Sequence, residues 1–575
     1  MRRSCDRVHA KLQRVLHRTR AAGLRIAIAL ALSACADPAP PRPNVVFVLA
    51  DDLGYGDIGV YHEDQTGRPP VVPTPNLDSL ARAGMRFRDA HSPAAVCAPS
   101  RFSALTGSNP QRSRIWGTWR ATQESALIQR WRHRSVGELL QRAGYRTAFL
   151  GKLHLGGDFR DQRGAVYRGR DLSQLDLEQP FAHGPREHGF DYSFVSPDGI
   201  QGPLYAWFEN DRWAPLSEAA RGLHGARFAE RSRLESLGAG HPAARAGPLV
   251  RGAHGDSNWD PRIAGPLLAR KAVAFVEDHA ERFPDQPFLL YYASQALHWP
   301  TTPPAEFAPG VAVAGRSGLG ARSDMLIELD LQVGAILDAL ERLGLARETL
   351  IFVTSDNGAW GFEAGAPQPG LRSEIEAGHD ATGGLRGRKA TIWEGGHRVP
   401  LIARWGDGSA AGSCIPPGRV SDELVSLNDW VATLYDLTGQ EMEEMQAMDA
   451  ASLVPLLLGS AAPALPLHPF LILQGGGASG GLVPKREIRS RAIRAGSWVL
   501  TLDGEGETSG LYDLASDPRQ ERDRRLEPEQ RERVRRLRAL FAHHDGPRDA
   551  RSTQRFEAAR RTPLPARCRG SAAAG

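Results

Sequence analysis

The chain has 575 residues, of which 41% are hydrophobic and 24% are charged, values typical of a globular protein that can form more than one core. Its formal net charge is +5, but residues 1–34 hold eight basic residues and one acidic residue. The rest of the chain therefore has a net charge of 5 − 7 = −2. The charge therefore does not indicate a nucleic-acid-binding protein. No internal repeat is visible.

The first 34 residues predict an export signal. Basic residues precede a short apolar stretch, residues 26–34, that is too short to cross a bilayer. The sequence Leu32-Ser33-Ala34-Cys35 resembles a bacterial lipobox, in which the cysteine is acylated, so Cys35 is the predicted lipidation site. A plain signal peptide is the alternative. Residues 35–43 predict a proline-rich tether, and the expected location is the periplasm or the outer membrane, or outside the cell.

The elements that follow predict a doubly wound α/β fold. Apolar runs predict strands at residues 44–50, 146–150, 287–293 and 350–354. Amphipathic patterns predict helices at residues 135–143, where Ser135 and Glu138 form a capping box, and at about 324–343. Alternating strands and helices favour a large, mixed or mostly parallel sheet with helices on both faces.

Other parts of the chain have different patterns. Residues 195–262 lack periodicity and predict an irregular excursion over the sheet edge, near the substrate mouth. We expect a catalytic domain at residues 44–439 and a smaller α+β subdomain at residues 440–545. Within the subdomain, residues 491–502 and 509–514 predict antiparallel strands and residues 528–542 predict an arginine-rich helix. Residues 546–575 predict a basic, partly disordered tail.

Polar residues follow the predicted strands directly. Asp51 and Asp52 follow the first strand, and Asp356 and Asn357 follow the fourth. Because ligands bind beyond the carboxyl ends of parallel strands, we expect these side chains to converge. Carboxylate and amide oxygens are hard ligands, so the set predicts a Ca²⁺ or Mg²⁺ site and not a zinc site.

Lysine is rare in this chain. Only five of the 71 basic residues are lysine: Lys11, Lys152, Lys271, Lys389 and Lys485. Where a positive charge alone suffices the chain uses arginine, so a retained lysine indicates a need for a compact ammonium group. Lys152 lies at the end of a predicted strand and Lys389 lies in Gly387-Arg388-Lys389, whereas Lys271 and Lys485 are interpreted as surface residues.

The run Cys97-Ala98-Pro99-Ser100-Arg101 resembles the signature of the type I sulfatases, members of the alkaline-phosphatase-like superfamily. Further segments resemble the same family, and together they extend over residues 44–514. They are residues 51–57, 151–156, 296–300, 354–358, 387–400 and 511–514. Leu153 departs from the pattern, because many relatives carry an aromatic residue there.

The resemblance implies a modified cysteine at a calcium site. Cys97 would be oxidised after translation to formylglycine, whose hydrate supplies the nucleophilic oxygen, and it would contact the metal together with the four oxygen ligands. Lys152 and Lys389 would bind sulfate. Arg101 would orient the modified residue, within a helix that opens at Ser100 and Arg101.

Two of the 18 histidines match family positions. By resemblance, His154 is the base that takes a proton from the spare hydroxyl of the sulfated hydrate, and His298 protonates the departing alcohol. Imidazole suits both roles because its pKa lies near neutrality.

The resemblance therefore implies an exported enzyme that hydrolyses aryl or carbohydrate sulfate monoesters. Its partners would be the sulfated substrate and a formylglycine-generating maturase, with membrane contact only through a lipid anchor. Two alternatives stay open, a phosphate or phosphonate monoester hydrolase of the same superfamily and an inactive glycan-binding lipoprotein. Cys414 and Cys568 either form a disulfide or stay as two thiols.

Overall fold

The computed structural model describes residues 42–128, 133–228, 230–245, 249, 252–360, 362–363, 366–367, 371–442, 446–459, 465–476, 488–545 and 568. The chain divides into two units, residues 43–568 and the two chain ends, and the first unit is the subject here. The predicted signal, the predicted lipidation site Cys35, most of the tether and the tail apart from Cys568 lie outside the described residues. Among the described residues, no helix is both long enough and apolar enough to span a bilayer.

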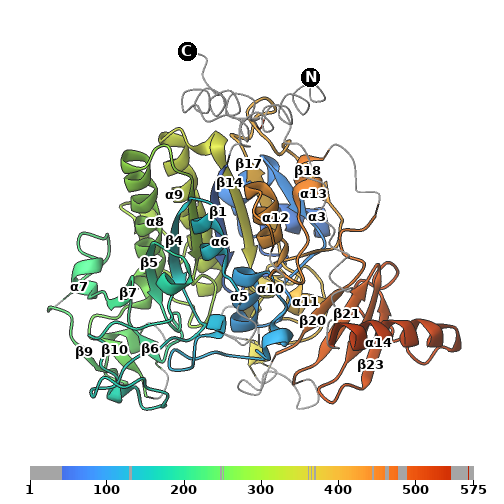
Figure 1. Ribbon diagram of the computed structural model, residues 1–575, viewed down its shortest axis with the longest axis horizontal. Helices are drawn as coiled ribbons and strands as arrows, with labels where there is room; N and C mark the ends of the chain where they lie inside the picture. Colours follow the sequence, from blue (N-terminus) through green and yellow to red (C-terminus); the bar gives the residue numbers. More distant parts are fainter. Residues whose placement is uncertain are drawn as a thin grey trace, which may run out of the picture. The chain divides into compact units, whose positions relative to one another are not determined.

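A central sheet organises this unit (Figure 1), and ten strands form it. Its order is β18 (Arg419–Ser421), β2 (Met85–Phe87), β17 (Leu401–Trp405), β14 (Thr349–Ser355), β1 (Asn44–Ala50), β11 (Phe288–Ala293), β4 (Arg146–Lys152), β5 (Tyr192–Ser196), β7 (Phe208–Glu209) and β8 (Arg212–Trp213). The five strands from β14 to β5 are parallel, and antiparallel pairs flank them on both sides. The predicted fold class is confirmed.

Helices cover both faces of the sheet. Within β1, Val45, Phe47 and Leu49 belong to one hydrophobic core, and the alternate residues Val46 and Val48 belong to the other. A strand buried on both faces needs an apolar residue at every position, which is why its sequence is continuously apolar. The first core contains α5 (Cys97–Thr106), α6 (Val136–Arg142), α12 (Asp429–Thr438) and α13 (Val454–Leu458), and the second contains α3 (Gly59–Thr66), α4 (Pro75–Arg82), α8 (Ala264–Arg282) and α9 (Ala321–Arg342).

The predicted helices are present, with small differences at their ends. Ser135 caps α6 with the predicted box: its hydroxyl accepts a hydrogen bond from the Glu138 backbone, and the Glu138 side chain accepts one from the Ser135 backbone. The helix predicted from residue 324 begins at Ala321, after a glycine without a side-chain cap. The absence of a capping side chain explains why the pattern did not locate its start.

The expectation of an irregular excursion at residues 195–262 is partly wrong. Strands β7 and β8 extend the central sheet, and β6 (Leu204–Tyr205), β10 (His254–Asp256) and β9 (Leu234–Ser236) form a sheet of three strands beside the short helix α7 (Leu216–Ala219). Strands of two or three residues are too short to show an alternating pattern, so the sequence did not reveal them.

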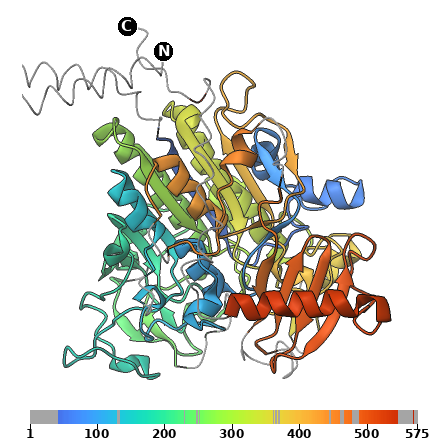
Figure 2. The same cartoon turned by 45° about the vertical axis from the view of Figure 1, so that its right-hand side comes forward.

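The C-terminal part contains an antiparallel sheet of four strands, β20 (Leu471–Gln474), β21 (Arg491–Ala495), β22 (Trp498–Leu502) and β23 (Thr508–Asp513). Helix α14 (Arg531–Asp545) runs across it (Figure 2) and packs Leu537 and Phe541 against the sheet. The helix and β23 were predicted, the predicted strand segment 491–502 is in fact the hairpin of β21 and β22, and β20 was not predicted. Its last residue, Gln474, accepts a hydrogen bond from the Ala95 backbone, two residues before Cys97.

The remaining described strands and α-helices are short. They are β3 (Ala90–His91) paired with β19 (Val425–Ser426), β12 (Glu306–Ala308) with β13 (Val311–Ala312), β15 (Phe362–Glu363) with β16 (Ala366–Pro367), and the helices α10 (Leu371–Glu376) and α11 (Glu394–His397).

Gly151 is a position in β4 where only glycine fits. Its φ is +105°, and a Cβ there would lie 1.9 Å from the carbonyl oxygen of Ala293 on β11. We predict that Gly151→Ala lowers the melting temperature markedly, because backbone strain and a clash combine. The control is Gly67→Ala, with φ +64° and open space around the added methyl group, which costs about 1 kcal/mol from strain alone. Equal melting temperatures for the two variants would contradict this account.

Candidate active site

The parallel strands end at one edge of the sheet, and polar side chains continue directly from three of them. Ala50 pairs with Ser355, so Asp51 and Asp356, the next residues along β1 and β14, start from the same level. Lys152 is the last residue of β4, two strands away from β1. The convergence expected from the sequence therefore follows from strand register.

Asp51 and Asp52 each use one oxygen and leave the other without a hydrogen bond. Asp51 Oδ2 accepts a hydrogen bond of 2.8 Å from Lys152 Nζ, and Asp52 Oδ1 accepts one of 2.6 Å from Lys389 Nζ. Asp51 Oδ1 and Asp52 Oδ2 are buried and have no hydrogen-bond partner. Two oxygens from adjacent residues are thus available to a ligand.

Asp356 and Asn357 provide two more such oxygens. The Asn357 amide nitrogen donates to Asp52 Oδ1 at 2.8 Å, so its oxygen Oδ1 is the free atom. Asp356 Oδ1 accepts a hydrogen bond of 3.3 Å from the Asp52 backbone. Its Oδ2 lies 2.7 Å from Arg101 Nη2 in an ion pair but has no hydrogen bond. All four predicted oxygen ligands therefore keep one buried oxygen free of hydrogen bonds.

Arg101 ties this acidic group to the neighbouring strand. Its Nη2 lies 3.5 Å from Asp51 as well as 2.7 Å from Asp356, and its Nη1 donates to the Lys152 carbonyl at 3.1 Å. The side chain is only 1% exposed. The Arg101 guanidinium therefore holds the Asp51 and Asp356 side chains in place.

Burial and charge act against each other at these carboxylates. Burial favours a raised pKa at Asp51, but the Lys152 ammonium and then His298 and Arg101 outweigh it and hold the pKa well below the usual value. At Asp356, burial and the adjacent Asp51 charge raise the pKa to about 7 against the attraction of Arg101. The acidic side chains thus compete for the positive charge that the protein supplies.

Cys97 is the first residue of α5, so the expectation that the helix opens at Ser100 was wrong by one turn. No side-chain cap precedes it, since Val96 occupies the N-cap position. The thiol is buried, and Lys389 Nζ lies 3.2 Å from Sγ. Burial raises the pKa of the Cys97 thiol to about 12 although Lys152 and Lys389 oppose it, so the unmodified side chain is a neutral thiol.

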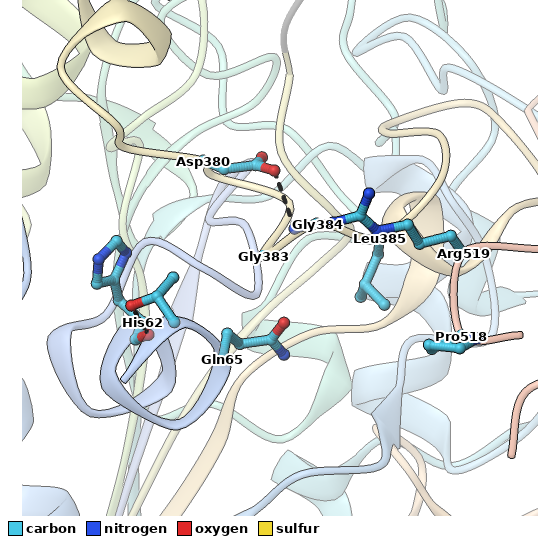
Figure 3. A pocket seen from close by; sticks show the side chains of 9 residues that line it. His62, Gln65, Asp380, Gly383, Gly384, Leu385, Pro518 and Arg519 are labelled. Atoms are coloured by element: carbon cyan, nitrogen blue, oxygen red, sulfur yellow. Dashed lines mark hydrogen bonds between the residues drawn. The ribbon is translucent and has the colours of Figure 1, made fainter. Parts of the chain in front are cut away.

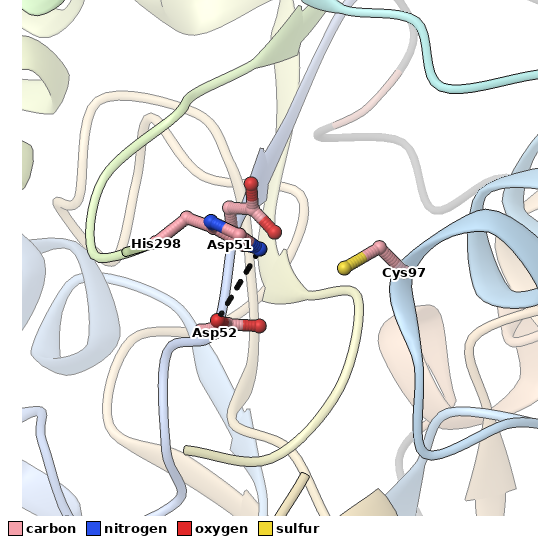
Figure 4. Close-up of side chains that lie close together, drawn as sticks. All are labelled: Asp51, Asp52, Cys97 and His298. Carbon is pink, nitrogen blue, oxygen red and sulfur yellow. Dashed lines mark ion pairs between the residues drawn. The ribbon is translucent and has the colours of Figure 1, made fainter. Parts of the chain in front are cut away.

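His298 joins the acidic residues from another side. Figure 4 shows it with Asp51, Asp52 and Cys97, and one donor atom from each of the four lies within 4.8 Å of the others. Its Nε2 is 3.8 Å from Asp52 Oδ2. Burial, and then Lys389 and Lys152, lower the pKa of His298 to about 4, so its ring is neutral near pH 7.

His154 lies two residues after Lys152 in the sequence and has a left-handed backbone conformation, with φ +55°. Its backbone N–H donates to the Pro197 carbonyl at 2.8 Å, while its Nδ1 is buried without a hydrogen-bond partner. Burial, then the charges of Lys152 and Arg101, lower the pKa of His154 well below its usual value. A neutral ring with a free nitrogen can accept a proton.

The family model for sulfatases matches residues 43–440, which is more than half of the chain. The chain belongs to the type I sulfatase family. The family lies within the alkaline phosphatase superfamily, and the chain is therefore a sulfuric ester hydrolase.

Named relatives agree with this assignment. The sulfatase is 34% identical to mouse steryl-sulfatase over 477 residues, which cover 77% of this chain and 69% of the relative. It is 33% identical to bovine arylsulfatase A, over 75% of this chain and 71% of the relative. It is 28% identical to an N-acetylgalactosamine-6-O-sulfatase of Bacteroides thetaiotaomicron, over 83% of this chain and 88% of the relative.

A solved structure gives the same result. A Bacteroides thetaiotaomicron protein, whose title concerns the metabolism of multiple glycosaminoglycans, matches with a TM-score of 0.67 and 25% identity. The match covers 88% of this chain and 99% of the other. The sulfatase therefore shares its architecture with that protein along nearly its whole length.

Two serines support the sulfatase site and had not been singled out from the sequence. Ser92 Oγ donates to the Asp356 carbonyl at 2.7 Å and also contacts Ser100 Oγ at 2.7 Å, which links the loop after β14 to α5. Ser355 Oγ accepts from the Leu53 backbone at 3.0 Å and donates to the Asn357 carbonyl at 2.8 Å. Serines are common in loops, so no sequence signal distinguished these two.

A cavity of about 270 Å³ lies elsewhere in the fold (Figure 3). Its lining includes His62, Gln65, Asp380 and Arg519, and the Asp380 carboxylate accepts a hydrogen bond of 2.9 Å from the Gly384 backbone. None of the predicted site residues lines it. This cavity is therefore separate from the candidate active site.

Lys389 is placed to act on substrate, and we predict that Lys389→Ala lowers kcat/KM for an aryl sulfate by about 10²–10³-fold, the usual effect of losing one charge-stabilising donor. The matched control is Lys271→Ala. Lys271 lies outside the site, where its Nζ is 2.8 Å from Glu209 Oε1, so this substitution should leave kcat/KM within about twofold. Steady-state kinetics of both purified variants checks this. An unchanged kcat/KM in Lys389→Ala would refute the role.

Proposed function

We propose that this sulfatase hydrolyses sulfate monoesters through a formylglycine made from Cys97, at a calcium site formed by Asp51, Asp52, Asp356 and Asn357. The observation that carries the proposal is the set of four buried oxygens, one from each proposed ligand, that follow the ends of β1 and β14 and have no hydrogen-bond partner. A buried oxygen left without a partner costs free energy unless a ligand compensates it.

The donor set fits a hard divalent cation. Three carboxylates and one amide oxygen match the oxygen ligands that calcium prefers, and the two free carboxylate oxygens of Asp51 and Asp52 come from consecutive residues. When bound, such an ion would polarise the sulfuryl group and stabilise negative charge during the reaction. Magnesium is the alternative ion, because it accepts the same ligand types.

An unmodified Cys97 would be a poor nucleophile at this site. A thiol whose pKa is raised to about 12 is almost wholly protonated at pH 7 and is a poor nucleophile. The hydrate of an aldehyde at this position would instead offer two hydroxyl oxygens beside Lys389, whose Nζ is 3.2 Å from Sγ. The N-terminal amides of α5 further favour an anion there.

The two histidines divide the proton transfers. One hydrate hydroxyl attacks sulfur and releases its proton to solvent, the bond from sulfur to the alcohol oxygen breaks, and His298 gives that oxygen a proton. His154 then removes the proton of the second hydroxyl, the carbon–oxygen bond to sulfate breaks, and sulfate leaves as the aldehyde re-forms. Water adds to the aldehyde and restores the hydrate. The neutral His154 suits its role as base, whereas His298 needs the negative charge of a bound substrate to hold its proton.

The proposed substrates are aryl or carbohydrate sulfates. Relatives at 28–34% identity are named for steryl, aryl and N-acetylgalactosamine-6-sulfate esters, which vary in the alcohol and share the sulfate. Residues 195–262 are proposed to contribute to alcohol specificity, because Gly199 packs against the aliphatic part of Lys152. We further propose export, with a lipid anchor at Cys35 and a periplasmic or outer-membrane location.

The deciding experiment on the nucleophile combines mass and activity. In protein made together with a maturase, we predict that the Cys97 peptide carries the formylglycine mass and that Cys97→Ala releases no sulfate from 4-nitrophenyl sulfate or from a panel of sulfated sugars. Cys568→Ala is the control and should keep full activity. Wild-type turnover by a preparation whose Cys97 peptide is wholly unmodified would reject the mechanism, and a preference for phosphate esters would favour the superfamily alternative.

Removal of the metal should act on stability as well as on rate. We predict that EDTA abolishes sulfate release and lowers the melting temperature, because three buried carboxylates are left with less compensation, and that calcium restores both. Asp356→Ala should show no melting shift on calcium addition. A calcium-induced shift of the same size in that variant, or full activity in EDTA, would argue against this site.

A further inference from the structure

A second group of metal-ligating side chains lies outside the active site. His91 ends β3, and Glu394 and His397 lie on α11, and all three are fully buried. One donor atom from each lies within 4.8 Å of the other two. None of these residues takes part in the proposed reaction.

The hydrogen bonds of the two rings define which nitrogens carry protons. His397 Nε2 is 3.1 Å from the Ile392 carbonyl, which can only accept, so this nitrogen carries a hydrogen. His91 Nε2 is 2.9 Å from Asp89, a carboxylate kept ionised by Arg494 at 3.0 Å and Arg398 at 3.4 Å. His91 Nε2 therefore carries a hydrogen as well.

The opposite nitrogens then face each other in an unusual way. His91 Nδ1 and His397 Nδ1 are 3.0 Å apart, and in two neutral rings both present lone pairs. Two lone pairs at this distance repel, so a cation must lie between them, either an additional proton or a metal ion. The separation is close to the 3.3 Å or so that two nitrogens adopt around tetrahedral zinc, where Zn–N is about 2.0 Å.

Glu394 distinguishes the two cations. Its Oε2 lies 3.4 Å from Arg398 Nη1, whereas its Oε1 is buried and has no hydrogen-bond partner. A proton shared by the two rings would leave Glu394 Oε1 without a partner, whereas a metal ion can bind this oxygen as its third ligand. Arg398 competes for the same carboxylate and is expected to weaken the affinity.

We propose that His91, His397 and Glu394 bind a zinc-class transition-metal ion, with water at the fourth position. Two histidines and a carboxylate suit zinc, unlike the all-oxygen set in the active site. Each histidine donates its other ring N–H to a carboxylate or a carbonyl, the outer-shell arrangement that orients metal-bound histidines.

The ion would join two segments that build the active site. The Ser92 backbone, next to His91, donates to the His397 carbonyl at 2.8 Å, and the Ser92 hydroxyl holds the Asp356 carbonyl. His397 lies eight residues after Lys389. A metal at this position would therefore fix the Cys97 and Lys389 segments against each other without touching substrate.

The test measures zinc in the full chain carrying Cys97→Ala, so that no thiol at the catalytic site competes for the metal. The protein is stripped with a chelator, saturated with calcium, equilibrated with ZnCl₂, desalted, and analysed by mass spectrometry for metals. We expect about one zinc per chain, and less than a tenth of that after adding His397→Asn. The control adds His279→Asn instead. His279 is also a buried histidine with a hydrogen bond to a backbone carbonyl, and the protein carrying this substitution should keep its zinc.

Cobalt gives a second readout that needs no histidine variant. Co²⁺ added to the same stripped protein should produce the visible absorption of a tetrahedral nitrogen and oxygen site, without sulfur charge-transfer bands. No bound zinc, equal zinc in all three proteins, or octahedral cobalt would overturn the proposal and assign a shared proton to the ring pair. Because neither readout depends on sulfate release, failure here would leave the proposed function unaffected.

Discussion

The structure depends on holding three carboxylates together in the interior. Asp51, Asp52 and Asp356 are all fully buried. Neighbouring like charges repel strongly in a medium of low polarity. Lys152 and Lys389 each pair with one oxygen of Asp51 and of Asp52 and leave the other oxygen without a hydrogen bond, while Arg101 pairs with Asp356 Oδ2. The charge arrangement therefore favours a further cation, and this need connects the fold to the proposed chemistry.

Strand register makes this assembly possible. Parallel strands deliver residues far apart in the chain to one edge, so Asp51 and Asp356 meet although 305 residues separate them. The remaining groups come on segments tied together by backbone hydrogen bonds, such as Ala390 N–H to the Ala95 carbonyl at 2.7 Å. Lys389 and Cys97 are thereby placed by the backbone, which limits how far either can move.

The sequence was most informative where a physical demand acts on every residue of an element. Strand β1 was predicted to the residue because both its faces are buried, and α6 was located by its capping box. The start of α5 was misplaced because Val96 carries no capping group. Strand β20 was missed because its three apolar residues do not distinguish a strand from a buried helix.

The site residues divide in the same way. Acidic pairs after apolar runs, and lysines kept in a chain that prefers arginine, indicated the proposed metal ligands and the lysines that pair with them. Contacts made only by the tertiary fold left no pattern: His91 and His397 lie 306 residues apart, and Ser92 resembles any loop serine. The comparisons establish the family, while the pairing of Cys414 and Cys568, both buried, stays open as it was from the sequence.

The most direct test of the central claim is an anomalous difference map from crystals of maturase-treated protein grown with calcium, recorded at a long wavelength. The account predicts one strong peak in contact with Asp51 Oδ1, Asp52 Oδ2, Asp356 Oδ2 and Asn357 Oδ1, and with the modified side chain of residue 97. A map without a peak at these four oxygens, in crystals of active protein, would contradict it.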